Sequence, residues 1–182
     1  SKEISNYLDF EKIIEICNNV EQLSKIKPQR FKKGRTSIAI ALDNSFNFYY
    51  HDNIEALRRE GAKIKFFSPI SDKKIPTCDC IYIGGGFPEI LGNKLSQNTT
   101  MKKSIKQAAE DGVPIYAECG GLMYLTNSIS HKNKKYKMIG LFDAETEMTK
   151  KMTLNYTEGR INSNCLISSP RKFRGHEFHY SK

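Results

Sequence analysis

Short apolar segments of strand type alternate with helical ones along most of this chain, and this alternation constrains the fold more than any other feature. Runs typical of buried strands occupy residues 37–42, 63–67, 80–83 and 114–119. Helical patterns lie between them, at about residues 52–60 and 99–111. Because parallel neighbouring strands need crossover connections, this order predicts an α/β fold, a mostly parallel sheet with helices on both faces.

The two ends of the chain have different patterns. Residues 1–35 contain Phe10, Ile13, Ile14 and Cys17 at helical spacing, followed by a basic stretch, and we expect a tail or linker there. Residues 36–182 are expected to form one domain. Beyond residue 135 the pattern is mostly that of strands, at residues 136–142, 151–157, 164–168 and 175–181.

Charge and composition exclude several classes of protein. The net charge is +9, but the lysines and arginines are scattered and no run interleaves them with stacking aromatics, so we expect no nucleic acid as partner. No apolar run approaches the roughly 20 residues of a membrane span, and no signal peptide pattern opens the chain. The five cysteines fit a reducing compartment, so a cytoplasmic location is expected. Cys78 and Cys80 have no second pair at zinc-site spacing, and no metal is expected.

The best candidate for a nucleophile is Cys119. It follows the apolar strand Pro114–Ala117 and precedes two glycines and a helix start. A tight turn between a strand and a helix lifts the side chain at the turn above the sheet, and small neighbours allow a substrate to approach. A helix N-terminus also favours negative charge, which suits a residue that reacts as the thiolate. An arbitrary cysteine is more often a buried core residue, and the turn favours the catalytic interpretation only for Cys119.

Acyl transfer at a cysteine needs hydrogen-bond donors for the oxyanion, and glycines can supply them. Gly85 and Gly86 follow the strand at residues 80–83, and Gly120 follows the cysteine. In a parallel sheet, ligands bind beyond the C-terminal strand ends, where these loops and the loop at residues 43–50 converge. The glycine run is not a phosphate loop, because no Lys-Ser or Lys-Thr pair follows at the required spacing.

Four histidines are available as a base for the cysteine. They are His51, His131, His176 and His179, of which His131 lies in a lysine-rich stretch and is expected to be exposed. Alternation along the strand at residues 175–181 places His179 and Glu177 on one face. A strand histidine is more often structural, yet His179 is the leading base candidate from the residues alone.

Several motifs together resemble the glutaminase domain of the cobyrinic acid a,c-diamide synthase family. They occur in the order Asp43–Tyr50, Phe66–Pro69, Ile83–Glu89, Ala117–Tyr124 and Gly175–Ser181. The resemblance implies a class I glutamine amidotransferase-like fold in which Cys119 attacks the side-chain amide of glutamine. The ammonia released would amidate the a and c acetate carboxylates of cobyrinate after ATP activates them.

The resemblance also implies what the chain itself would and would not carry. ATP and Mg²⁺ are expected on an N-terminal ATP-binding domain, residues 1–35 resemble only the tail of that domain, and this chain is expected to bind no cofactor. The family's base histidine lies in a strand beyond residue 182, which predicts a domain truncated at its C-terminus. Within the chain, the strand at residues 175–181 would line the glutamine pocket or the acceptor side, with Tyr180 as a substrate-binding residue.

Two alternatives to a cobyrinate-amidating enzyme remain open. The tetrapyrrole that accepts the ammonia can instead be the substrate of nickel-sirohydrochlorin a,c-diamide synthase. That substrate differs from cobyrinate only in its macrocycle and metal. The chain can also be a non-catalytic binding module, or an inactive fragment, that holds a tetrapyrrole or a synthase partner while Cys119 stays idle.

Overall fold

A computed structural model describes residues 7–21, 31–162 and 172–182 of the chain. The chain divides into two units, Ser1–Arg30 and Phe31–Lys182. The expected strand at residues 164–168, with Cys165, lies outside the described residues.

The described part of the first unit is the helix α1, Phe10–Asn18. The side chain of Asp9 accepts a hydrogen bond from the Lys12 amide at 3.0 Å and so caps its first turn. The expected helical spacing is confirmed, and the apolar side chains of this helix, Phe10, Ile13 and Ile14, are exposed.

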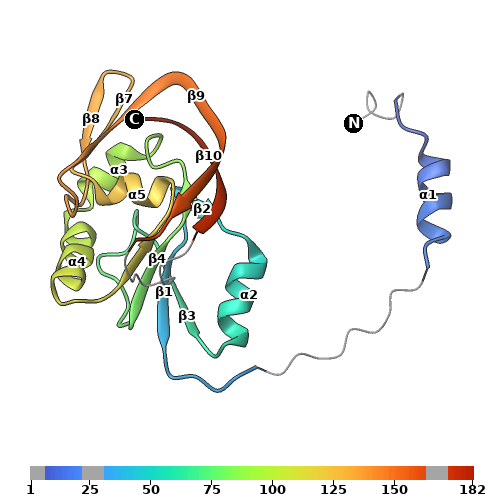
Figure 1. The fold of residues 1–182 in the computed structure, drawn as a ribbon, viewed down its shortest axis with the longest axis horizontal. Helices are drawn as coiled ribbons and strands as arrows, with labels where there is room; N and C mark the ends of the chain where they lie inside the picture. Colours follow the sequence, from blue (N-terminus) through green and yellow to red (C-terminus); the bar gives the residue numbers. More distant parts are fainter. Residues whose placement is uncertain (1–6, 22–30, 163–171) are drawn as a thin grey trace. The chain divides into compact units, whose positions relative to one another are not determined.

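The second unit is built on a four-stranded parallel sheet (Figure 1). Its strands, in spatial order, are β3 (Lys63–Phe67), β1 (Ser37–Ala41), β4 (Cys80–Ile83) and β6 (Ile115–Ala117). All three neighbouring pairs are parallel. The helices are α2 (His51–Arg59), α3 (Gly92–Gln97), α4 (Thr99–Glu110) and α5 (Gly120–Leu125). The four strands expected from the sequence and the two expected helices are confirmed.

Helices cover both faces of this sheet because its strands carry apolar residues on both sides. On one face Ile38 and Ile40 pack with Ile54 of α2. On the other face the larger core lies under α3, α4 and α5, with fully buried Ile81, Ile83, Leu95, Met101, Ile105 and Tyr124. Continuous apolar strands of this kind are typical of parallel sheets buried on both sides.

A small two-stranded sheet lies at the C-terminal ends of these strands. It pairs β2 (Phe46–Phe48) with β5 (Gly85–Gly86) and was not expected from the sequence, since three and two residues are too few to show a period. The Asp43 carboxylate shapes the turn before β2. Its Oδ1 accepts from the Ser45 amide at 2.7 Å, and its Oδ2 accepts from the Ser68 hydroxyl at 2.8 Å and the Ile70 amide at 2.9 Å.

Replacing Asp43 by alanine is expected to lower the free energy of unfolding by about 2–4 kcal/mol, because several donors lose one charged acceptor together. Urea denaturation followed by circular dichroism measures this change. The matched control is Asp52→Ala at the exposed first turn of α2, expected to cost under about 1 kcal/mol. Equal effects of the two substitutions would contradict the role assigned to Asp43.

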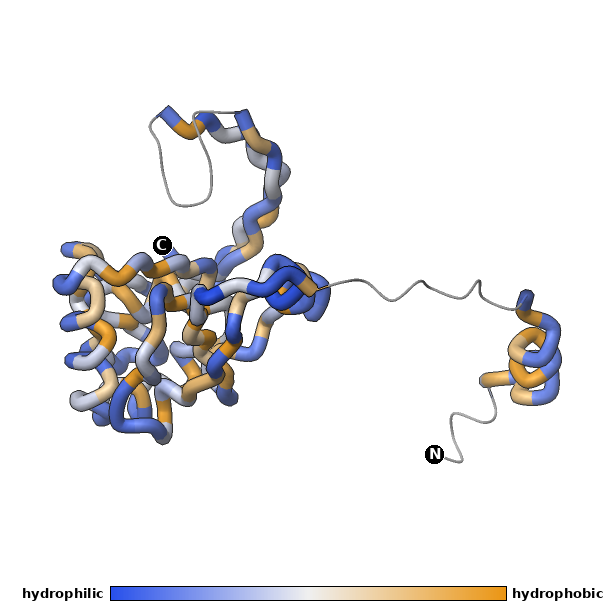
Figure 2. The backbone as a smooth tube through the Cα atoms, turned by 90° about the horizontal axis from the view of Figure 1, so that it is seen from below, coloured by the Kyte–Doolittle hydropathy of each residue, from blue (hydrophilic) through white to orange (hydrophobic). Residues whose placement is uncertain are grey.

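A second sheet occupies the last part of the chain, with strand order β10-β9-β7-β8. Its members are β7 (Ser128–His131), β8 (Lys134–Lys137), β9 (Glu145–Arg160) and β10 (Lys172–Ser181). The long strands β9 and β10 form an antiparallel ribbon that projects from the body of this unit (Figure 2). The strands expected at residues 151–157 and 175–181 are confirmed as parts of this ribbon.

The strand expected at residues 136–142 is wrong beyond Lys137. Gly140 has a φ of 67°, in the left-handed region, which ends an extended segment. The amides of Ile139, Gly140 and Leu141 donate to the carbonyls of Tyr124, Thr126 and Leu125 at 2.8–3.1 Å. This apolar segment therefore satisfies the C-terminal carbonyls of α5 and its vicinity instead of joining a sheet.

His131 was expected to be exposed, and this expectation is also wrong. It ends β7, its side chain is half-buried, and its Nε2 is buried with no hydrogen-bond partner among the described residues. The lysine-rich segment after it turns back into β8, and polarity along the sequence did not reveal this hairpin.

Candidate active site

Cys119 lies in a sharp turn at the C-terminal edge of the parallel sheet. It follows β6 and Glu118, and it is the N-cap of α5, as expected from the sequence. Its backbone has φ 51° and ψ −117°, a left-handed conformation that costs a residue with a Cβ about 1–3 kcal/mol. The residue is exposed. The fold therefore holds a strained cysteine at the place where parallel sheets bind ligands.

Two glycines after the cysteine let the turn pack tightly against the end of β4. A methyl group added to Gly121 would lie 2.2 Å from the carbonyl oxygen of Ile83, and one added to Gly120 would lie 2.8 Å from Cδ of Pro88. Any larger residue at either position would push the cysteine turn away from the sheet. The pair of glycines is thus a requirement of close packing at this turn.

The glycine-rich loop lies directly beside the cysteine. A methyl group added to Gly85 would lie 3.5 Å from Cβ of Cys119, and one added to Gly120 would lie 3.2 Å from the amide nitrogen of Gly86. The amide of Gly121 donates to the Glu118 carbonyl at 2.9 Å, whereas that of Gly120 donates to no carbonyl of the described residues. The structure thus brings together Cys119, Gly85, Gly86 and Gly120, four residues singled out from the sequence.

Glu118, next to the cysteine, is held by tyrosines that the sequence analysis did not select. Its Oε1 accepts from the Tyr82 hydroxyl, and its Oε2 lies 3.5 Å from the Tyr116 hydroxyl. The Tyr49 hydroxyl donates to the Ala41 carbonyl and accepts from the Gly84 amide, the latter at 2.8 Å. One feature of the sequence could have pointed to Tyr82 and Tyr116 as residues near the site: both lie close to the C-terminal end of a predicted strand.

Burial keeps these tyrosine hydroxyls protonated. It raises the pKa of Tyr49 to about 12. Burial, followed by the contact with the Glu118 carboxylate, raises the pKa of Tyr82 and of Tyr116. Because the folded pKa of Tyr49 exceeds its ordinary value of 10.0, its contribution to stability is complete below about pH 10 and is lost as the pH rises through about 12.

His179 and Tyr180 lie on opposite faces of β10. His179 is half-buried, its Nδ1 is 2.8 Å from the Ser181 carbonyl oxygen, and its Nε2 is 3.8 Å from a Glu177 carboxylate oxygen. The Tyr180 hydroxyl donates to Sδ of Met152 at 3.4 Å. No hydrogen bond or ion pair of the described residues joins either side chain to Cys119 or the glycine loop. Their roles as base and substrate-binding residue stay predictions.

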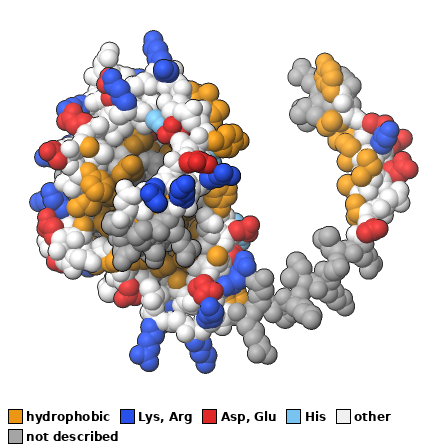
Figure 3. All heavy atoms as spheres, viewed as in Figure 1, with side chains coloured by type: hydrophobic (Ala, Val, Ile, Leu, Met, Phe, Trp, Pro, Cys, Tyr) orange, Lys and Arg blue, Asp and Glu red, His pale blue; other side chains and the backbone are white. Residues whose placement is uncertain are grey.

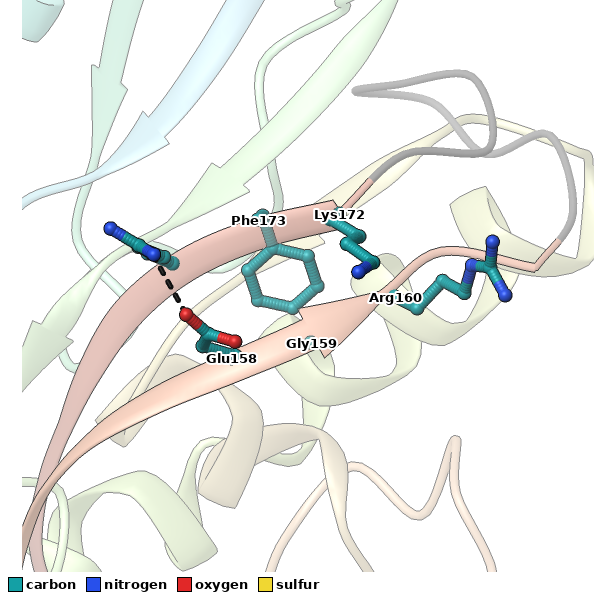
Figure 4. A pocket seen from close by; sticks show the side chains of 6 residues that line it. Glu158, Gly159, Arg160, Lys172 and Phe173 are labelled. Atoms are coloured by element: carbon teal, nitrogen blue, oxygen red, sulfur yellow. Dashed lines mark hydrogen bonds and ion pairs between the residues drawn. The ribbon is translucent and has the colours of Figure 1, made fainter.

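The ribbon also bears a shallow hollow near its far end, between β9 and β10 (Figure 4). An ion pair of 2.8 Å joins Arg174 to Glu158, and the ring of Phe173 covers Gly159, its cross-strand partner. Cys119 is not among the residues that line this hollow.

Aromatic residues border the cysteine on the side of the β2–β5 sheet. Phe48 lies over Gly85, since a methyl group there would be 3.2 Å from its Cβ, and its ring meets that of Phe87 edge-on at 4.9 Å. Both rings are about half exposed. Phe46, two residues earlier, is fully buried. The loop at residues 43–50 therefore has one phenylalanine in the core and another at the surface. Figure 3 shows hydrophobic side chains between charged groups on the face seen there.

Two further findings concern metals and membranes. Within residues 7–21, 31–162 and 172–182, no three or more His, Cys, Asp or Glu side chains are grouped to hold a metal ion. Cys80 begins β4, with Cys78 just before it, and burial raises the pKa of both thiols.

No helix in the described part of the chain combines the length and the apolar character needed to cross a membrane.

A parallel sheet with a cysteine turn beside a glycine loop defines the class of glutamine amidotransferase-like α/β proteins. The fold matches a solved structure described as a glutamine amidotransferase, with a TM-score of 0.53 and 18% identity over 79% of this chain and 70% of that one. It also matches the structure of PurLQS from Thermotoga maritima, with a TM-score of 0.56 and 16% identity over 81% and 68% of the two chains. These matches confirm the expected fold class.

Residues 37–182 match the model of the CobB/CobQ-like glutamine amidotransferase domain, and the chain belongs to that family. It is 49% identical to cobyrinate a,c-diamide synthase of Methanococcus vannielii and 46% identical to that of Methanococcus maripaludis, over 99% and 98% of this chain. The resemblance stated from the sequence is confirmed. The aligned parts are 38% and 40% of these relatives, so the chain spans about two fifths of their length.

Proposed function

We propose that this chain is the glutaminase part of an ATP-dependent a,c-diamide synthase of cobalamin biosynthesis. One observation carries the proposal: Cys119 occupies a strained, exposed turn with Gly85 against its Cβ. A nucleophile and backbone donors at one strand end are what acyl transfer from an amide requires. The relatives' name, cobyrinate a,c-diamide synthase, supplies the acceptor.

In the proposed reaction the Cys119 thiolate attacks the side-chain carbonyl carbon of glutamine. The amides of Gly85, Gly86 and Gly120 donate to the oxyanion that forms. The C–N bond then breaks, and the nitrogen takes a proton and leaves as ammonia, with a γ-glutamyl thioester remaining on the sulfur. Water hydrolyses the thioester to glutamate and returns the thiol. His179 is the proposed group that carries the proton, and Tyr180 the proposed contact to substrate.

The second half of the proposed reaction uses the ammonia. An ATP-dependent synthase module, on the same polypeptide or on another subunit, would activate the a and c acetate carboxylates of the corrinoid, and ammonia would displace the activated oxygen. The glycine loop of this chain is not followed by the Lys-Ser or Lys-Thr pair of a phosphate loop. ATP and Mg²⁺ are therefore proposed for the synthase module.

Labelling with a chloroketone analogue of glutamine tests the first half. We expect fast alkylation at Cys119, at least about 10-fold faster than at Cys17, which is also exposed, because a bound analogue places its reactive carbon at the sulfur. Excess glutamine should protect Cys119 and leave Cys17 unchanged. Intact mass and peptide mapping measure both sites.

The same labelling separates the other interpretations. Slow labelling of Cys119 that glutamine does not affect would contradict a working glutaminase site and favour a non-catalytic module. With His179→Gln, a slower, still glutamine-protected reaction would support the histidine as base. An unchanged rate in this variant would remove His179 from that role.

A further inference from the structure

Three tyrosine rings form a row on one face of the parallel sheet. Tyr82 of β4 and Tyr116 of β6 are register partners, with ring centroids 5.3 Å apart. Tyr49, from the segment between β2 and α2, meets Tyr82 edge-on at 5.1 Å. We refer to Tyr49, Tyr82 and Tyr116 as the tyrosine row. Two of its members lie near the C-terminal ends of β4 and β6, and the hydroxyl of the third, Tyr49, reaches the end of β1.

The hydroxyls of the row are bonded to the two segments that form the candidate site. The Tyr49 hydroxyl accepts from the amide of Gly84, the residue before Gly85. The Tyr82 hydroxyl donates to the carboxylate of Glu118, the residue before Cys119. One bond thus fastens the glycine loop and the other fastens the cysteine turn, and the three rings, in edge-on and tilted contact, join them.

We propose that the tyrosine row is a positioning device that fixes the distance between Cys119 and the amides of the glycine loop, a role that rests on the proposed glutaminase function. The two segments are adjacent, with close packing at Gly85 and Gly120 and a hydrogen bond of 3.1 Å from the Glu118 amide to the Ile83 carbonyl. A small shift of either segment would misplace the oxyanion donors. Tyr49 also donates to the Ala41 carbonyl at the end of β1, which ties the loop to the centre of the sheet.

The hydroxyls, rather than the rings, carry the proposed role. Phenylalanine would fill the same space between Ile40 and Ile54 of the core on this face, so burial alone does not require a tyrosine at Tyr82. Glu118 is half-buried, and a carboxylate at this depth needs donors, which Tyr82 and Tyr116 supply. The specific contribution of the two phenolic hydroxyls is thus to donate hydrogen bonds to the Glu118 carboxylate.

The test uses Tyr49→Phe, Tyr82→Phe and the double variant of the full chain, with Tyr156→Phe as the matched control because Tyr156 is 96% exposed on the ribbon. The rate of Cys119 alkylation by the glutamine-analogue chloroketone should fall about 10- to 100-fold in the single variants. The loss should appear in the maximal rate and leave the half-saturating concentration within about twofold, because the row does not contact the ligand. Alkylation by iodoacetamide, which needs no oxyanion donors, should stay within about twofold of wild type.

Three results would overturn the proposal. The first is that the tyrosine variants are alkylated by the chloroketone as fast as wild type. The second is that alkylation by the chloroketone and by iodoacetamide slows to the same extent, as general unfolding would cause, and the third is that Tyr156→Phe loses as much of the alkylation rate as Tyr49→Phe. A wild-type chain whose Cys119 labelling is insensitive to glutamine would instead contradict the proposed function.

In that last case amide hydrogen exchange still decides the positioning role. Exchange of the Gly84 amide, followed in a peptide spanning residues 80–88, should be at least about 10-fold faster in Tyr49→Phe than in wild type, since this amide loses its acceptor. Unchanged exchange there would overturn the inference independently of any activity.

Discussion

Cys119→Ser is expected to lower glutamine-dependent ammonia release by at least about 1,000-fold, to the background of the assay. A serine hydroxyl is nearly all protonated at neutral pH and reacts only when a base is well placed, whereas the thiolate reacts by itself. The turn would survive the exchange, because serine tolerates the same backbone and removes no packing from an exposed position. If Cys119→Ser loses ammonia release while its free energy of unfolding is unchanged, the nucleophile in glutamine hydrolysis is the Cys119 sulfur.

Ammonia release by the purified chain, alone and together with an ATP-dependent synthase module, is the measurement. Cys17→Ser is the matched control, since Cys17 is also exposed but lies in the separate N-terminal unit. It should keep the wild-type rate. Normal release by Cys119→Ser would refute the nucleophile, and loss of release in Cys17→Ser would show that the assay reports something other than the site.

Gly121→Ala is expected to lower the free energy of unfolding by about 2–3 kcal/mol, as overpacking of a tight contact does. In most helix interiors a glycine-to-alanine substitution has the opposite effect and raises the free energy of unfolding by up to about 1 kcal/mol. Gly121 lies in α5, yet a methyl group on it would be 2.2 Å from the Ile83 carbonyl oxygen, which is backbone and cannot rotate away. The turn at Cys119 would have to move with it.

Urea denaturation of Gly121→Ala tests this sign. Gly175→Ala is the matched control, because the atom nearest to an added methyl there is Oγ1 of Thr157 at 3.9 Å. We expect its stability within about 0.5 kcal/mol of wild type. A Gly121→Ala variant as stable as wild type would show that α5 packs less closely on β4 than the structure has it.

Much of the fold follows from patterns of residues that are close in sequence. The four parallel strands were predicted because each is a short apolar run between helical patterns, and burial on both faces is what such runs require. The turn at Cys119 was predicted from a strand, a cysteine and two glycines in succession. Local backbone preferences determine these features, so a window of about ten residues contains enough information.

The errors in the sequence analysis have a common physical cause. Residues 138–142 are apolar and were taken as strand, but their amides bond to carbonyls at the end of α5. His131 was taken as exposed, but its side chain is half-buried where β7 pairs with β8. In both cases the deciding partner is a different segment, and polarity along the chain carries no information on which segment that is.

The sequence by itself determined the class of fold, the family and the position of the cysteine turn, because each depends on local pattern or on motifs in order. Only the tertiary structure decided that Gly85 lies against Cys119, that Phe48 is exposed while Phe46 is buried, and that three tyrosines support Glu118 and Gly84. These relations join residues up to 36 positions apart, as from Tyr82 to Glu118. Contacts of that kind arise from packing of the sheet edge, where side chains from β4, β6 and the β2–α2 segment meet.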